Sequence, residues 1–219
     1  MTGKLLAPFR AALSAVLARP LLILTVWSGG AALAALIYLW LGLPERTAGD
    51  LLLSAVWLLL LAAGALVLLW RSFAAFQEAE AGWASCLRRL GRLAPVVALM
   101  AAVVAAVLWR FSGFPWWLAG AAVILALLPI AGQAAAGASG FRQAASVLAR
   151  PEYWLSGAIA LLTGLLLPWL LVSWTPVHGG LLVETASLVV RFAFAWLAAV
   201  VSWLLLAALI AELGRQSPA

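Results

Sequence analysis

Six long runs of apolar residues divide this chain, and they constrain its fold more than any other feature. Each run is close to the ~20 residues that a helix needs to cross ~30 Å of hydrocarbon at ~1.5 Å per residue. The runs extend over Leu21–Leu43, Leu51–Trp70, Ala94–Phe111, Pro115–Ala131, Trp154–Trp174 and Phe192–Leu213. The sequence therefore predicts six membrane-spanning segments. The third and fourth runs are the shortest, and a re-entrant pair is the alternative interpretation for them.

The composition indicates that lipid is the main solvent of this chain. Of its 219 residues, 67% are hydrophobic and only 9% are charged, whereas a soluble domain is about 25% charged. Backbone groups in hydrocarbon must bond internally, so only helices or closed barrels can span a bilayer. Barrel strands alternate apolar and polar residues, but the run over residues 51–60 is almost continuously apolar. The predicted fold class is therefore all-α, a polytopic membrane helical bundle.

The basic residues predict an orientation. If the six spans alternate in direction, ten of the thirteen Lys and Arg residues fall on the side that carries both chain ends. Lys and Arg are enriched in cytoplasmic loops of membrane proteins. We therefore expect an integral protein of a bacterial cytoplasmic membrane, the inner membrane, with both termini in the cytoplasm.

A short motif recurs along the chain and suggests internal repeats. The segment Phe9–Pro20 resembles Phe141–Pro151, and Trp83–Pro95 is a fainter copy. Each copy is basic, ends in proline and precedes two apolar runs. The pattern predicts one transmembrane domain over residues 1–219, built from three parallel hairpin units over approximately 9–75, 83–133 and 141–213. A short cytoplasmic amphipathic helix is expected to precede each hairpin.

These short segments place apolar residues on one helical face and arginines elsewhere. Such a helix lies in the headgroup layer of a membrane with its apolar side down. We expect the arginines to contact anionic lipid headgroups, with ordinary juxtamembrane caps as the alternative interpretation. The predicted headgroup contacts are Arg10, Arg19, Arg88, Arg89, Arg92, Arg142 and Arg150.

A second polar cluster precedes the last apolar run on the predicted outer side. It consists of His178, Glu184 and Arg191. Glu184 and Arg191 are seven residues apart, so they share one face of a helix two turns apart. The cluster is predicted to be a polar mouth or a partner contact, and the alternative is a water-facing helix extension with snorkelling side chains.

The inventory of reactive residues argues against several kinds of site. One histidine and one cysteine cannot form a zinc site with three or four nitrogen or sulfur ligands. The apolar runs carry essentially no acidic or histidine relay of the kind that proton pumps use. Nucleotide-binding and hydrolase motifs are not found in a credible setting. We predict no cofactor, no catalytic residue and no nucleic-acid partner.

Three functions of different classes follow from these patterns. The favoured one is a non-catalytic membrane-embedded subunit or scaffold that binds a protein partner, or a second copy of itself, together with anionic lipid. The alternative is a small permease or lipid-handling transporter for an apolar or lipid-like substrate. An intramembrane enzyme is the least favoured, because the sequence offers no recognisable pair of nucleophile and base.

Overall fold

The fold is entirely helical in the residues that the computed structural model describes, which are 6–43, 47–77, 83–110, 116–136, 141–173 and 179–216. The eight helices of these segments are α2 (Ala7–Leu17), α3 (Pro20–Leu41), α4 (Ala48–Ala74), α5 (Trp83–Arg110), α6 (Trp116–Ala136), α7 (Phe141–Leu148), α8 (Pro151–Ser173) and α9 (Leu181–Arg215). Six of them, all except α2 and α7, are long and apolar enough to cross a membrane. The all-α class and the six long apolar helices, which suggest a membrane protein, are thus confirmed for the described part of the chain.

Local sequence signals account for where several helices begin. Pro8 and Pro20 occupy the first turns of α2 and α3, where the missing N–H of proline costs nothing. At the start of α4, the Thr47 hydroxyl accepts a hydrogen bond from the Asp50 N–H at 3.2 Å, and the Asp50 carboxylate accepts one from the Thr47 N–H at 2.9 Å. This capping box gives acceptors to two backbone N–H groups that have no partner within the helix.

Removing this cap gives a first testable prediction. Thr47→Ala is expected to lower the free energy of unfolding by about 1 kcal/mol, because the first turn of α4 loses a side-chain acceptor. The Thr185 hydroxyl does not cap a helix, because it donates to the Leu181 carbonyl within α9. Thr185→Ala is therefore the matched control, and it should lower the free energy of unfolding by less. Denaturant titration in mixed micelles measures both values. Equal losses would contradict a capping role for Thr47.

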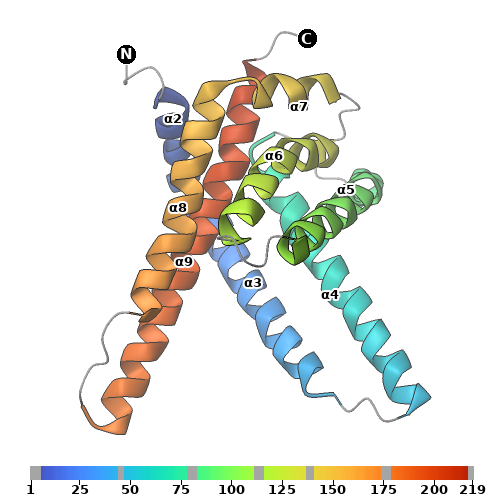
Figure 1. Ribbon diagram of the computed structural model, residues 1–219, viewed down its shortest axis with the longest axis vertical. Coiled ribbons are helices and arrows are strands. Elements are labelled where there is room, and N and C mark those ends of the chain that lie inside the picture. The colour runs from blue at the N-terminus through green and yellow to red at the C-terminus, as the bar shows by residue number, and fades with distance from the viewer. Residues whose placement is uncertain are drawn as a thin grey trace.

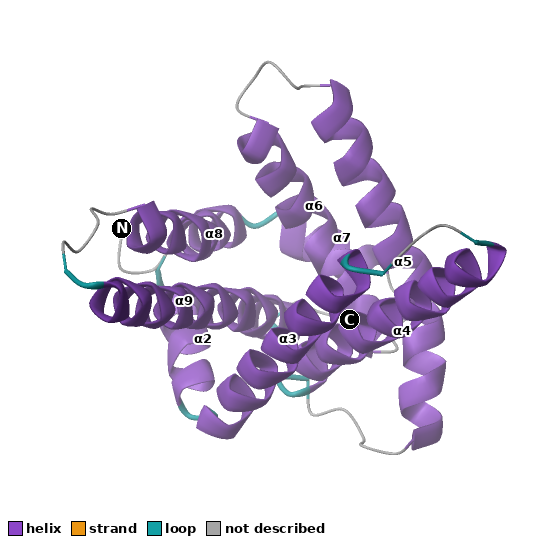
Figure 2. Cartoon of the chain, turned by 90° about the horizontal axis from the view of Figure 1, so that it is seen from below, coloured by secondary structure: helices purple, strands orange, loops and turns teal. Residues whose placement is uncertain are grey.

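The six long helices form three pairs that point in different directions. In Figure 1, α8 lies along α9, while α3 and α4 lead away from them on the other side. Figure 2 shows that α5 and α6 extend in a further direction. The three pairs come together around the C-terminal half of α9, at the end of the molecule where α2 and α7 also lie (Figure 1). We call this meeting region, centred on residues 204–214 of α9, the hub.

The hub is the hydrophobic core of the protein. Every residue of α9 from Leu204 to Ala211 is buried, as expected for a helix that is apolar on all sides and surrounded by protein. Each of the other helices contributes at least one buried apolar side chain to the same cluster. These side chains include Val16, Leu22, Phe73, Leu93, Leu128, Val147 and Tyr153.

A proline in α6 creates a specific link to α8 within this core. Pro129 lies inside α6 and has no N–H, so the Leu125 carbonyl four residues earlier lacks its helical donor. The Tyr153 hydroxyl of α8 donates a hydrogen bond to this carbonyl at 2.6 Å. Tyr153 is itself fully buried. The bond therefore satisfies a carbonyl that neither helix nor lipid could satisfy.

The hub contrasts with the outer parts of the hairpins, whose side chains are largely exposed. In the apolar windows of α3 and α4, only 11% of the residues are buried inside the protein, against 56% for α9. In a bilayer, lipid tails cover such faces without cost. The exposed leucines of these helices thus agree with a membrane setting.

Two details of the helices differ from the predictions. The segment Trp83–Pro95 does not form a separate short helix, because α5 runs through Pro95 to Arg110. The apolar face of α2 was expected to meet lipid, but Val16 of this face is buried in the hub, and Phe9 and Leu13 pack against it.

The last helix extends beyond its predicted apolar run. It begins at Leu181, so it includes Glu184 and Arg191, which were expected to share a helix face. Its 35 residues span ~52 Å at ~1.5 Å each, which exceeds a ~30 Å hydrocarbon layer.

Candidate functional site

The hub end of the molecule brings together the C-terminal ends of three long helices. Helix α4 ends at Ala74, α6 at Ala136 and α9 at Arg215, and α7 packs against both α6 and α9. The last carbonyls of a helix have no helical donor and carry partial negative charge. Hydrogen-bond donors are therefore favoured next to these three C-terminal turns.

Two glutamine side chains donate to these helix ends. Gln77 Nε2 donates to the Gly132 carbonyl of α6 at 3.1 Å, and Gln143 Nε2 of α7 donates to the Gly214 carbonyl of α9 at 2.9 Å. A carbonyl can only accept, so the NH₂ group of each carboxamide must face it. The two side-chain oxygens consequently point elsewhere. Gln77 Oε1 is buried and has no hydrogen-bond partner in the described part of the chain.

A third glutamine completes the group. Gln133 of α6 is only 7% exposed. A Cβ atom added at Gly214 would lie 3.5 Å from Gln133 Nε2 and 3.6 Å from Gln143 Nε2, so both amides pass close to the backbone of α9. The glutamines border a cavity of about 210 Å³, which we call the carboxamide pocket. Its lining residues are Phe76, Gln77, Gln133, Ala136, Gln143, Ile210, Ala211, Gly214 and Arg215.

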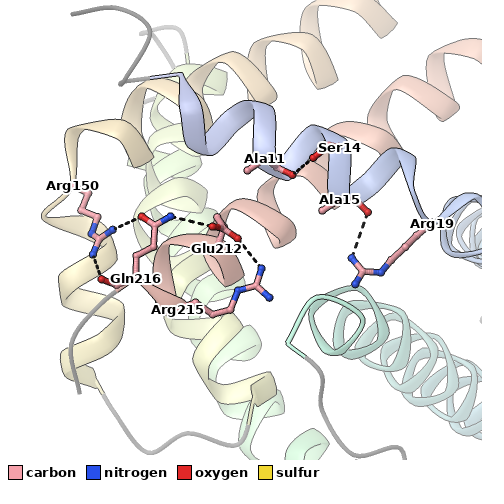
Figure 3. Close-up of polar contacts among 8 residues, drawn as sticks. All are labelled: Ala11, Ser14, Ala15, Arg19, Arg150, Glu212, Arg215 and Gln216. Carbon is pink, nitrogen blue, oxygen red and sulfur yellow. Dashed lines mark hydrogen bonds and ion pairs between the residues drawn. The ribbon is translucent and has the colours of Figure 1, made fainter.

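A chain of charged and polar side chains lies beside this pocket (Figure 3). Arg215 Nη2 contacts Glu212 Oε2 at 2.7 Å, and Gln216 Nε2 donates to Glu212 Oε1 at 3.0 Å. The Arg150 guanidinium donates to Gln216 Oε1 at 3.1 Å and to the Gln216 carbonyl at 3.0 Å. Exposed ion pairs contribute little stability. The network instead fixes the end of α9 against the start of α8.

Arg19 joins α2 and α3 to the same region. Its guanidinium lies 4.8 Å from the centre of the Phe76 ring, a distance at which a cation is attracted to the ring face. It also donates to the Ala15 carbonyl at 3.4 Å (Figure 3). Since Phe76 also lines the carboxamide pocket, one face of its ring is held by a cation from outside the pocket.

The structure places the seven arginines predicted to contact headgroups in different environments. Those of α5, together with Arg10 of α2 and Arg142 of α7, are mostly exposed. Arg89 differs, because its Nη1 is buried and has no hydrogen-bond partner among the described residues. Arg19 and Arg150 are held by the contacts described above. Whether these side chains meet lipid headgroups stays a prediction.

The predicted outer cluster lies far from the hub. Glu184 is exposed in the first turn of α9, and Arg191 is half-buried two turns later on the same helix. Both positions are in the N-terminal part of α9, whereas the hub surrounds its C-terminal part. His178 lies outside the described residues. The polar mouth and the water-facing extension both stay open as interpretations of this cluster.

Sequence reasoning missed the carboxamide pocket, although a signal was present. The chain has no asparagine and four glutamines, Gln77, Gln133, Gln143 and Gln216. Each glutamine follows the end of an apolar run or lies in a short amphipathic segment. All four side chains lie at the hub end in the structure.

Comparison with known protein families, with characterised proteins and with solved structures finds no match to this chain. The function therefore has to be inferred from the residues and their arrangement.

Proposed function

We propose that this chain is a non-catalytic, membrane-embedded subunit or scaffold, which binds another membrane protein or a second copy of itself along its hairpins. The observation that carries the proposal is the divergence of the three helix pairs away from the hub (Figure 1). Helices that associate in lipid rely on close packing. Helices α3 and α4 have little such packing along their outer halves and offer long apolar faces to a partner.

The polar residues within the spans support a structural role. The hydroxyls of Thr25 and Thr163 donate to carbonyls one turn earlier in their own helices. Ser202 of α9 donates to the Ala160 carbonyl of α8. The first two bonds lie within single helices and the third joins α9 to α8, so all three hydroxyls are already engaged with backbone carbonyls.

The proposal includes the arrangement and location expected from the sequence. The three helix pairs are repeats that each start on the same side of the membrane. The hub end faces the cytoplasm of a bacterial cell, and the arginines of this end contact anionic headgroups. The positive charge around the hub supports this orientation.

Site-specific crosslinking in native membranes tests the proposal. A photo-reactive amino acid at Leu59 of α4, which is 70% exposed, is expected to give an adduct with one polypeptide of defined mass. Leu61 on the same helix is 8% exposed, and the same probe there should react only within the chain. Adducts with lipid alone at Leu59 would contradict a partner on this face.

One feature favours lipid handling as a second candidate function. A groove of about 380 Å³ lies between α3 and α9, lined by Pro20, Ile23, Leu24, Trp27, Ala193, Phe194 and Leu197. At one wall, Trp196 Nε1 donates to the Trp27 carbonyl at 3.0 Å, which joins the two helices. The groove suits an acyl chain. If vesicles containing the purified chain exchange fluorescent lipid between leaflets no faster than protein-free vesicles, this second function is excluded.

A further inference from the structure

We propose that two copies of this chain associate side by side in the membrane through the N-terminal part of α9. The inference rests on the proposed function for one point: the chain spans a bilayer, and every copy is inserted in the same direction. It goes beyond that function because it names the partner, a second copy, and places it on α9 rather than on α3 and α4.

The N-terminal part of α9 extends past its neighbour α8 (Figure 1). The two helices are antiparallel, and a Cβ atom added at Gly164 of α8 would touch the side chain of Ser202 of α9. Helix α8 ends nine residues after Gly164, at Ser173, and the residue nine positions before Ser202 is Ala193. Residues 181–190 of α9 therefore lie beyond the end of α8.

Lipid tails cannot cover all of this part of α9. The helix is ~52 Å long, and a tilt of about 20° shortens its span only to roughly 49 Å, against ~30 Å of hydrocarbon. Even if the two ends share the excess equally, nearly two turns at the N-terminal end lie outside the hydrocarbon. In these turns, Leu181 and Leu182 are 82% and 86% exposed. Apolar surface of this kind outside lipid indicates a protein interface.

One face of this part of α9 has the spacing of a helix-packing seam. Val183, Ser187, Val190 and Phe194 are separated by four, three and four residues, the spacing at which the side chains of two helices interlock. We call these four residues the α9 seam. A groove of about 620 Å³ follows the seam, and every described residue that lines it belongs to α9. These lining residues are Leu182, Val183, Ala186, Ser187, Val190 and Arg191.

The Ser187 hydroxyl lies in this groove without a hydrogen bond to any described residue. By contrast, the Thr185 hydroxyl donates to a carbonyl of its own helix, as hydroxyls in helices commonly do. A hydroxyl can both donate and accept, so the Ser187 side chains of two copies can bond to each other. Such a bond between membrane helices favours one register of the seam.

The positions of the charges also suit a second copy. Copies inserted in the same direction are related by a twofold axis along the membrane normal, so each residue of the seam meets its equivalent at the same depth. Glu184 and Arg191 flank the seam on one side. In a parallel helix pair this side faces the opposite flank of the partner helix, where Ala186 and Ala193 lie. Like charges therefore do not meet, and the small alanines leave room for the stem of the arginine.

Disulfide crosslinking of the full chain in native membranes tests the proposal. Cys86, the single cysteine, is replaced with alanine, so each variant carries one thiol. Val190→Cys places it in the seam, and Phe192→Cys places it nearly opposite, because two residues turn a helix by ~200°. The two natural side chains are 53% and 54% exposed, which makes them a matched pair.

We expect Val190→Cys to form a dimer of twice the 23.0 kDa chain mass. Its yield should exceed that of Phe192→Cys by about tenfold or more, because a disulfide requires two Cβ atoms within ~4.5 Å.

Substitutions at the same two positions give a second measurement, the dimer fraction of the purified chain in lipid bilayers. Val190→Arg brings two guanidinium groups together in the seam and should lower this fraction about tenfold or more. Phe192→Arg adds the same charge outside the seam and should change the fraction by less than about twofold. Ser187→Ala should lower it about threefold. Single-molecule photobleaching measures the fraction, and circular dichroism verifies that each variant is folded.

Three results would overturn the inference. Equal crosslinking of Val190→Cys and Phe192→Cys would mean random collision. A Val190→Cys adduct with a different polypeptide would mean another partner. A purified chain that stays monomeric at every protein-to-lipid ratio would mean that lipid covers the seam. The probe at Leu59 reports on α4, so a dimer through α9 with only lipid adducts at Leu59 would contradict the partner on α4 and support the inference, and the opposite pair of results would do the reverse.

Discussion

Leu209→Ala is expected to lower the free energy of unfolding by about 2–5 kcal/mol, whereas Leu188→Ala on the same helix should change it by less than about 1 kcal/mol. Both residues belong to α9 and both substitutions remove the same atoms. Leu209 is 1% exposed, and Leu188 is 49% exposed. The difference between the two effects therefore measures what surrounds each half of the helix.

The physical reason lies in how the lost volume is filled. Around Leu209, the neighbours belong to packed helices of the hub, and they can collapse into the space only in part, so a cavity remains. Around Leu188, lipid chains are fluid and fill the space at once. Truncation there removes less packing against protein, because half of the Leu188 side chain is exposed.

Denaturant titration of the purified chain in mixed micelles measures both losses. The same titration in reconstituted bilayers shows whether the difference between the two variants is independent of the micelle. Similar losses at the two positions would mean that the C-terminal half of α9 is not enclosed by the other helices, and the hub would not be the core of the protein.

The six apolar helices could be predicted from the sequence because lipid acts on each segment separately. A run such as Leu51–Trp70 must form a helix in hydrocarbon whatever the rest of the chain does. The starts of α3 and α8 were also visible, since Pro20 and Pro151 close the repeated motif immediately before each helix. Pro95 was likewise expected to separate two helices, but this prediction is wrong, because Pro95 lies inside the continuous helix α5.

What covers an apolar face could not be predicted. The two halves of α9 are similar in composition, yet one is enclosed by protein and the other is exposed. The same holds for α2, whose apolar face was expected to meet lipid, whereas its Val16 lies in the hub. An apolar side chain avoids water equally well against a lipid tail or another helix, so the sequence pattern is the same in both cases.

The carboxamide pocket depends even more on tertiary structure. Gln77 bonds to Gly132, and Gln143 bonds to Gly214, and nothing in the local sequence marks these pairs. A glutamine after an apolar run is an ordinary helix cap or surface residue. Only the convergence of three helix ends gives the glutamines a shared role.

The bond between Tyr153 and the Leu125 carbonyl leads to the second large expected effect. Tyr153→Phe should lower the free energy of unfolding by about 1–3 kcal/mol, because it leaves a buried carbonyl without a donor. Phenylalanine keeps the ring and its packing. The loss would be smaller if the carbonyl had another donor, and Pro129 is the reason that it has none.

A double-mutant cycle isolates this effect. In Pro129→Ala, the new backbone N–H can donate to the Leu125 carbonyl, as in an ordinary helix. Adding Tyr153→Phe to this variant should therefore cost about 1 kcal/mol less than adding it to the natural chain, a coupling within the range that direct contacts show. The cycle cancels any cavity that Pro129→Ala leaves by itself. If Tyr153→Phe costs the same in both backgrounds, the hydroxyl does not replace the missing proline donor, and the link between α6 and α8 is packing alone.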